Sequence, residues 1–202
     1  YVDKPPSFWT RVLWTDESSF EYHGSQKKTY VLLPKETRKK LAPVSERMSH
    51  GGGSVMFWGC ISSNGAGDLV PIDGTMNQHK YLDILNNHAF QSGDKIIGES
   101  FIFQQDNAPY HKSRMVMQIL IGSGVEILDW PPQSPDLNVI ENVWSYIKAK
   151  RSVSLTRTRE ETISEVKGLW EEVPPEMFSK LVDSVPKRLR NLIDSKGGYI
   201  FY

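Results

Sequence analysis

The stretch from Trp130 to Trp144 (WPPQSPDLNVIENVW) constrains the fold more than any other part of the chain. It opens as a proline-rich loop, and Ser134 followed by Pro135 then predicts the start of a helix. Serine is a favoured N-cap, and proline suits the first helical position because no N–H is needed there. Apolar residues recur at helical spacing at Leu137, Ile140, Trp144 and Ile147. We therefore expect a helix that docks one apolar face onto the domain.

Glu141 is the anomaly on this helix. At about 100° per residue it lies about 40° from Leu137, on the edge of the apolar face and two turns into the helix. A carboxylate in that place needs a partner, and Lys148 is the cation within reach on the same side. Glu141 therefore indicates either an ion pair with Lys148 or a functional site.

Size and composition indicate one globular domain. The 202 residues suit one domain with a large core better than two domains, so we expect a single domain over 1–202. Apolar and charged fractions of 39% and 24% are typical of a globular protein. No apolar run approaches the roughly 18 residues of a membrane span, and we expect no membrane partner. The single Cys60 excludes an internal disulfide framework and a cysteine-based zinc site.

Charge is balanced overall but locally clustered. Lys and Arg number 24, as do Asp and Glu, so the net charge does not indicate a nucleic-acid binder. Basic runs nevertheless occupy 35–40, 148–159 and 187–190. Such runs form either solvated faces or contacts to phosphates, and both interpretations stay open.

Hydrophobic patterning predicts a mixed sheet covered by helices. Strands are expected at 11–20, 54–62, 68–72, 101–106 and 126–128, with a further plausible strand at 29–33. Helices are expected at 77–91, at 111–120 and from 134 onward, with breaks at 174–175 and at Pro186. Antiparallel strands followed by alternating helices and strands are the element order of the ribonuclease-H-like (retroviral integrase-like) α/β fold, with a five-stranded mixed sheet flanked by helices.

Three carboxylates stand out by position. Asp16 shares one face of its strand with Trp14 and Phe20. Asp106 closes a later strand, and Glu141 lies on the helix described above. If they converge at one edge of the sheet, their oxygens suit Mg²⁺ or Mn²⁺, and two such ions about 4 Å apart promote phosphodiester exchange. Taken singly, each acid is equally compatible with a cap or a solvated turn.

The sequence motifs around these acids resemble the signatures of the Tc/mariner superfamily of transposases. The motifs are WTDES at 14–18, QDNAPYH at 105–111 and SPDLNVIENVW at 134–144. The segment HGGGSVMFWG at 50–59 is similar to the family's glycine strip. Between Asp106 and Glu141 lie 34 residues, as in the branch whose third acid is glutamate. The resemblance runs from about Phe8 to the C-terminal helices, and Val139 departs from it where many relatives carry proline.

The resemblance implies a DDE catalytic domain that cuts DNA and joins a 3′ hydroxyl to a target, usually at TA. By analogy, Asp16 contacts both of two Mg²⁺ ions, for which Mn²⁺ substitutes, while Asp106 and Glu141 each complete one site. The implied partners are transposon ends, target DNA and a second copy of the chain in a synaptic complex. The implied location is the nucleus.

Other residues carry weaker hypotheses. By position, His111, Asn107 and Asn142 are candidates for contacts behind the acids or near the DNA, with packing or capping as their alternative. Asp136 is near the helix start and is interpreted as complementing the helix dipole rather than binding metal. Glu17 points away from Asp16 and is interpreted as lying outside the site.

The segment 34–53 resembles the clamp loop of the family, which contacts a partner subunit and DNA. It ends in the glycine triplet Gly51, Gly52 and Gly53. We expect the family's N-terminal helix-turn-helix modules to lie outside this chain. Two alternatives to a transposase are a domesticated remnant that binds without catalysis and a structure-selective nuclease of the same fold.

Overall fold

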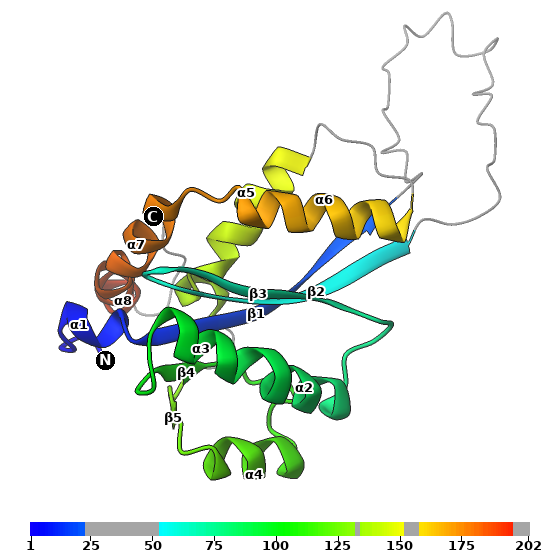
Figure 1. Ribbon diagram of the computed structural model, residues 1–202. Coiled ribbons are helices and arrows are strands. Elements are labelled where there is room, and N and C mark those ends of the chain that lie inside the picture. The colour runs from blue at the N-terminus through cyan, green and yellow to red at the C-terminus, as the bar shows by residue number, and fades with distance from the viewer. Residues whose placement is uncertain (23–52, 132–133, 152–157, 196–202) are drawn as a thin grey trace, which may run out of the picture.

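The computed structural model describes residues 1–22, 53–131, 134–151 and 158–195, and it is built on one five-stranded sheet (Figure 1). The order across the sheet is β3-β2-β1-β4-β5. β1 pairs antiparallel with β2 and parallel with β4, so the predicted mixed sheet is confirmed. The strands are β1 Val12–Tyr22, β2 Gly53–Ser62, β3 Gly65–Ile72, β4 Ile102–Gln104 and β5 Glu126–Ile127.

Helices cover both faces of the sheet (Figure 1). One face carries α2 Gln78–Ile84, the π-helical turn η1 Leu85–Ala89, α3 Phe90–Ile96 and α4 Arg114–Gly122. The other carries α5 Ile140–Arg151, α6 Arg159–Glu171, α7 Pro175–Asp183 and α8 Val185–Asp194, with the short α1 Pro6–Trp9 beside them. Over the described ranges, no helix is both long and apolar enough to cross a bilayer.

Two parts of the sequence-based interpretation fall outside the described residues. They are the plausible strand at 29–33 and most of the clamp-type segment 34–53, including Gly51 and Gly52. Gly53 is the first residue of β2.

The central strands divide their side chains between two cores, as their alternation predicts. Trp14 and Phe20 of β1 pack into the core beneath α5 to α8, whereas Leu13 packs into the core beneath α2 to α4. β2 is buried on both faces, because Phe57 and Trp58 point to opposite cores. This alternation also sends Asp16 and Glu17 to opposite faces.

Gly59 of β2 makes room for the helix that carries Glu141. Its Cα lies opposite that of Asp16 in the antiparallel ladder. A Cβ added at Gly59 would stand 2.8 Å from the Trp144 ring and 2.9 Å from the Trp170 ring. The missing side chain therefore lets two indoles, one from α5 and one from α6, lie directly on the sheet next to Asp16.

The helix predicted to start at Ser134 starts later. Pro135–Leu137 forms a 3-10 turn, and α5 begins at Ile140. The separation arises at Asn138, whose backbone is extended (φ −79°, ψ 108°) and whose side-chain oxygen accepts the Ile140 N–H at 3.4 Å. Glu141 is therefore in the first turn of α5, not two turns into a helix. The predicted apolar face is confirmed, since Leu137, Ile140, Trp144 and Ile147 are all buried.

Two other predicted elements are shorter than expected. The strand predicted at 101–106 ends at Gln104, which leaves Asp106 in the loop that follows. The helix predicted at 111–120 begins at Arg114 with Ser113 as its N-cap, so His111 precedes it. Both changes place signature residues in the irregular segment between β4 and α4.

Several cations of the basic runs bind other residues of the same chain. Arg188 is buried and donates from Nη1 to the carbonyl of Asp136 at 3.0 Å and from Nη2 to Oδ1 of Asn142 at 2.8 Å. It thereby fastens α8 to the start of α5. In the run 148–159, ion pairs join Lys150 to Glu172, Arg151 to Glu165 and Arg159 to Asp73.

β3 is an edge strand whose pairing with β2 is irregular. Its pairing with β2 shifts register between Gly59 and Ile61, and Pro71 lies within the strand. At the peptide between Gly67 and Asp68, side chains from both helical layers supply hydrogen bonds. The indole of Trp170 donates to the Gly67 carbonyl at 3.1 Å, and the Asp68 N–H donates to Oγ of Ser92 at 3.1 Å.

We predict that Gly59→Ala destabilises the fold by about 1–3 kcal/mol, as overpacked core sites do, because the new methyl group collides with two rigid indoles. Gly168→Ala in α6 is the matched control. A Cβ there meets nothing within 4 Å, so this change should be neutral or stabilise the helix by up to about 1 kcal/mol. Urea unfolding curves of both variants test this, and equal stabilities would contradict the packing argument.

Candidate active site

The three acids come from three separate elements. Asp16 lies in the middle of β1, Asp106 follows the end of β4, and Glu141 lies in the first turn of α5. β4 runs parallel to β1, with Gln104 paired to Trp14, so the chain leaving β4 passes beside Asp16. The sheet and the docked helix therefore bring the acids to one region, as predicted.

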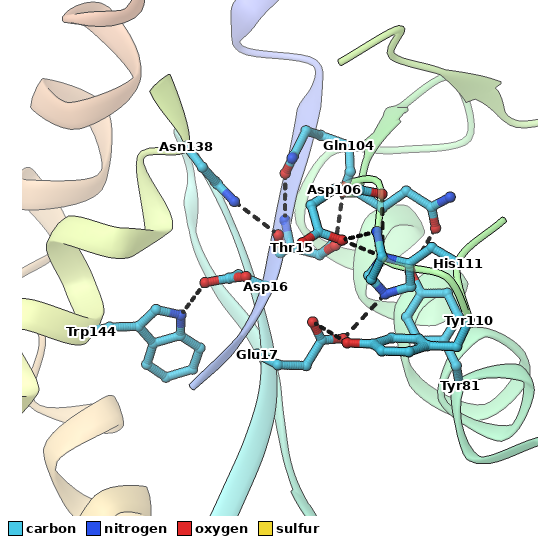
Figure 2. Close-up of polar contacts among 12 residues, drawn as sticks. Thr15, Asp16, Glu17, Tyr81, Gln104, Asp106, Tyr110, His111, Asn138 and Trp144 are labelled. Carbon is cyan, nitrogen blue, oxygen red and sulfur yellow. Dashed lines mark hydrogen bonds and ion pairs between the residues drawn. The ribbon is translucent and has the colours of Figure 1, made fainter. Parts of the chain in front are cut away.

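The backbone of Thr15 is held by side chains where β1 and β4 separate (Figure 2). Its N–H donates to Oε1 of Gln104 at 3.1 Å, and its hydroxyl donates to the Gln104 carbonyl at 2.7 Å. Its carbonyl accepts from Nδ2 of Asn138 at 3.1 Å. These bonds tie β4 and the loop before α5 to the residue that precedes Asp16.

Asp16 is a largely buried carboxyl group oriented by an indole. Nε1 of Trp144 donates to its Oδ2 at 3.1 Å (Figure 2). Burial, followed by repulsion from Glu141 and Glu17, raises the pKa of Asp16 from 3.8 to about 8. Asp16 therefore holds a proton at neutral pH when no cation is bound.

Glu141 and Asp16 are near enough for each carboxyl group to influence the ionisation of the other. Burial raises the pKa of Glu141, and the charge of Lys148 opposes that rise without cancelling it. Lys148, the alternative partner named from the sequence, thus compensates only part of the cost of placing Glu141 here. The two neighbouring carboxyl groups therefore resist being ionised together at neutral pH unless a cation is bound.

Asp106 stands in a different environment, because it has a cationic neighbour. Its Oδ1 accepts from Nδ1 of His111 at 2.6 Å and from the Ala108 N–H at 2.9 Å. The hydrogen bond from His111 lowers the pKa of Asp106. Burial by itself lowers the pKa of His111, but hydrogen bonds to Asp106 and Glu17 outweigh it and raise that pKa to about 9.

The acids are near one another but not preassembled as a metal centre. Over the ranges that the structure describes, no three His, Cys, Asp or Glu side chains stand close enough to enclose an ion. Oδ1 of Asp106 is engaged by His111, while Asp16 and Glu141 influence each other's ionisation. The donor set nevertheless fits Mg²⁺ or Mn²⁺, since all three groups offer carboxyl oxygens and a cation would favour ionisation of the Asp16–Glu141 pair.

The weaker candidates make contacts that support a role in holding the site together. Nδ2 of Asn107 donates to the Trp130 carbonyl at 3.0 Å, which joins the loop after β4 to the start of the signature stretch. Oδ1 of Asn142 accepts from Arg188. Asp136 contributes its backbone carbonyl to the same arginine.

Several contacts that build the site were not anticipated from the sequence. They are the bonds of Gln104 and Asn138 to Thr15, of Trp144 to Asp16, and of Glu17 to His111 and Tyr110. Strand alternation correctly placed Glu17 on the face opposite Asp16. It could not show that the segment after β4 folds back over that opposite face.

Comparisons with known proteins show the family of the chain. Residues 11–163 match the family model described as DDE superfamily endonuclease. The chain is 34% identical over 192 residues to the Tcb1 transposase of Caenorhabditis briggsae, covering 95% of this chain and 70% of that protein. It is also 34% identical over 189 residues to the Tc1 transposase of Caenorhabditis elegans, covering 94% and 69%.

The fold is similar to that of a solved relative. The crystal structure of the catalytic domain of Mos1 mariner transposase superposes with a TM-score of 0.75 at 18% identity, covering 96% of this chain and 86% of that one. The ribonuclease-H-like fold predicted from the order of elements is thereby confirmed. With the family match over most of its length and its close transposase relatives, the chain belongs to the Tc1/mariner transposases of the DDE endonuclease superfamily.

Proposed function

We propose that Asp16, Asp106 and Glu141 hold two divalent metal ions at which this domain cuts DNA and transfers the resulting 3′ hydroxyl to a target strand. Membership of the family makes the chain a DNA-cleaving and strand-transferring enzyme that uses divalent metal. The observation that carries the assignment of residues is the Asp16–Glu141 pair, two partly buried carboxyl groups that resist being ionised together and have too little compensating positive charge. Relatives support the choice of ion, since Mos1 catalytic domain structures contain Mg or Mn.

When bound, the metal ions would supply Lewis acidity, activating a water or sugar hydroxyl and stabilising the leaving oxygen. The chain supplies the ligands and their orientation. Asp16, which senses the charges of both Glu141 and Asp106, would be the ligand shared by the ions, and Trp144 fixes the direction of its carboxyl group. Glu141 is aimed by the docking of α5, and Asp106 by the hydrogen bonds to its Oδ1.

The substrates follow from relatives that have been seen with DNA. A Mos1 transposase structure is a paired-end complex with the left transposon end. We propose that this chain likewise acts on transposon ends and target DNA, with TA as its target site, and that it pairs with a second copy in the complex. We also propose a nuclear location, where such DNA lies.

The activity is tested by Mn²⁺-dependent strand transfer of a pre-cut DNA end into a plasmid. We expect Asp16→Asn and Glu141→Gln each to reduce the rate at least about 100-fold, since losing only an outer-shell partner typically costs 10- to 100-fold. Asp94→Asn, at an exposed acid of α3, should leave the rate unchanged. Equal rates for Glu141→Gln and wild type would show the metal assignment to be wrong, and wild-type cleavage without strand transfer would favour a nuclease.

The raised pKa of Asp16 predicts that this residue lowers the stability of the folded chain as the pH rises. Its pKa in the folded chain, about 8, lies above its ordinary value of 3.8, so the folded chain retains a proton that the unfolded chain releases. The free energy of unfolding should therefore fall as pH rises from about 4 to 8. One pKa unit is worth about 1.4 kcal/mol, so even a quarter of this shift is worth on the order of 1 kcal/mol.

We accordingly predict that Asp16→Asn, although inactive, is more stable than wild type in metal-free buffer, and that its advantage is larger at pH 8 than at pH 5. Chemical denaturation in the presence of EDTA measures both differences, with Asp94→Asn again as the control. An advantage that does not grow with pH would contradict the argument.

A further inference from the structure

Glu17 is a nearly buried carboxylate on the face of β1 opposite Asp16. Its side chain is 9% exposed. Oε1 lies 3.3 Å from Nε2 of His111, and Oε2 accepts from the hydroxyl of Tyr110 at 3.3 Å (Figure 2). A charged group is rarely buried without a partner. Here the two partners, Tyr110 and His111, come from the segment between β4 and α4.

His111 joins Glu17 to Asp106. Its Nδ1 lies 2.6 Å from Oδ1 of Asp106, while its Nε2 faces Glu17. Each ring nitrogen thus faces a carboxylate oxygen, and both are donors, as in a charged imidazole. The ring is 3% exposed and is flanked by the rings of Tyr81 and Tyr110, with centroids at 4.1 and 4.4 Å. The imidazole therefore has one orientation, set at one end by Glu17.

Asp106 depends on its hydrogen bonds for orientation, because no regular element holds its backbone. It lies beyond the end of β4, in irregular backbone, and its side chain is 53% exposed. Its Oδ1 is fixed by His111 and by the Ala108 N–H. Among the described contacts no hydrogen bond ends on Oδ2, which leaves that oxygen available to a cation.

We infer that Glu17 is a positioning residue for the acid site, which holds His111 so that His111 in turn holds Asp106 in the direction needed for metal binding. The chain Glu17–His111–Asp106 leads from the face of β1 opposite Asp16 to the loop beyond β4, so consecutive residues of β1 serve the same site, Asp16 directly and Glu17 through the histidine. This inference rests on the proposed role of Asp106 as a metal ligand. Groups behind a ligand commonly tune metal affinity by fixing its orientation.

The test measures the affinity of the purified chain for Mn²⁺ alone, by titration calorimetry. Glu17→Leu removes both contacts and should weaken Mn²⁺ binding about tenfold, a loss typical of an outer-shell partner. Glu17→Gln keeps an oxygen that can accept from Nε2 of His111 and should stay within about threefold of wild type. Glu21→Gln, at an exposed position of the same strand, is the matched control and should bind like wild type.

A double-mutant cycle shows whether Glu17 acts through Asp106. In the Asp106→Asn background, Glu17→Leu should cause no further loss of Mn²⁺ affinity, because the group it positions is already gone. A merely structural role would lower the melting temperature of Glu17→Leu but leave the Mn²⁺ affinity of the folded protein unchanged, and this would overturn the inference. Should Glu17→Leu not fold, Glu17→Ala takes its place.

Failure of the inference and failure of the proposed function give different results. Wild-type binding that is abolished by Asp16→Asn but insensitive to Glu17→Leu overturns the role of Glu17 and leaves the metal site standing. Absence of Mn²⁺ binding by wild type, or binding that Asp16→Asn does not change, overturns the metal site itself and with it the role of Glu17.

Discussion

The site depends first on one indole. Trp144 lies on the sheet over the space left by Gly59 and donates its N–H to Asp16, the residue opposite that glycine in the ladder. The same side chain thus packs α5 against β1 and β2 and fixes the direction of an acid. Because Glu141 is in the first turn of α5, its distance from Asp16 is set by how closely this ring approaches the backbone. Core packing and active-site geometry are here a single constraint.

The three acids differ in how their charge is compensated. Asp106 is stabilised as an anion by His111, whereas Asp16 and Glu141 face each other with only the partial help of Lys148. Burying an uncompensated pair costs stability in the free protein. If metal binds at these acids as proposed, a dication would recover that cost, so part of its affinity would come from the repulsion between the two carboxyl groups in the free chain. Asp106, whose charge is compensated by His111, would in contrast contribute an oxygen held in a fixed direction.

Much of this arrangement follows from local sequence rules, and the remainder does not. The alternation of β1 was sufficient to place Asp16 with Trp14 and Phe20 and to send Glu17 to the other face. The start of α5 was misplaced because Ser134 and Pro135 form a good helix start locally, whereas a tertiary bond from Asn138 to Thr15 holds the chain extended and delays the helix to Ile140. The contact of His111 with Glu17 joins residues distant in the chain through irregular backbone, for which no periodicity gives a signal.

The rim of the sheet has a consequence for assembly. β3 contains a proline and a register shift, and its peptide at 67–68 is engaged by Trp170 and Ser92, while the opposite edge strand, β5, has only two residues. Neither edge offers a long, regular row of free peptide groups to a foreign strand. If copies gather on a DNA molecule as proposed, they would thereby be protected from pairing edge to edge through their sheets. Contacts between them would then be made by side chains and loops, which can be specific and reversible.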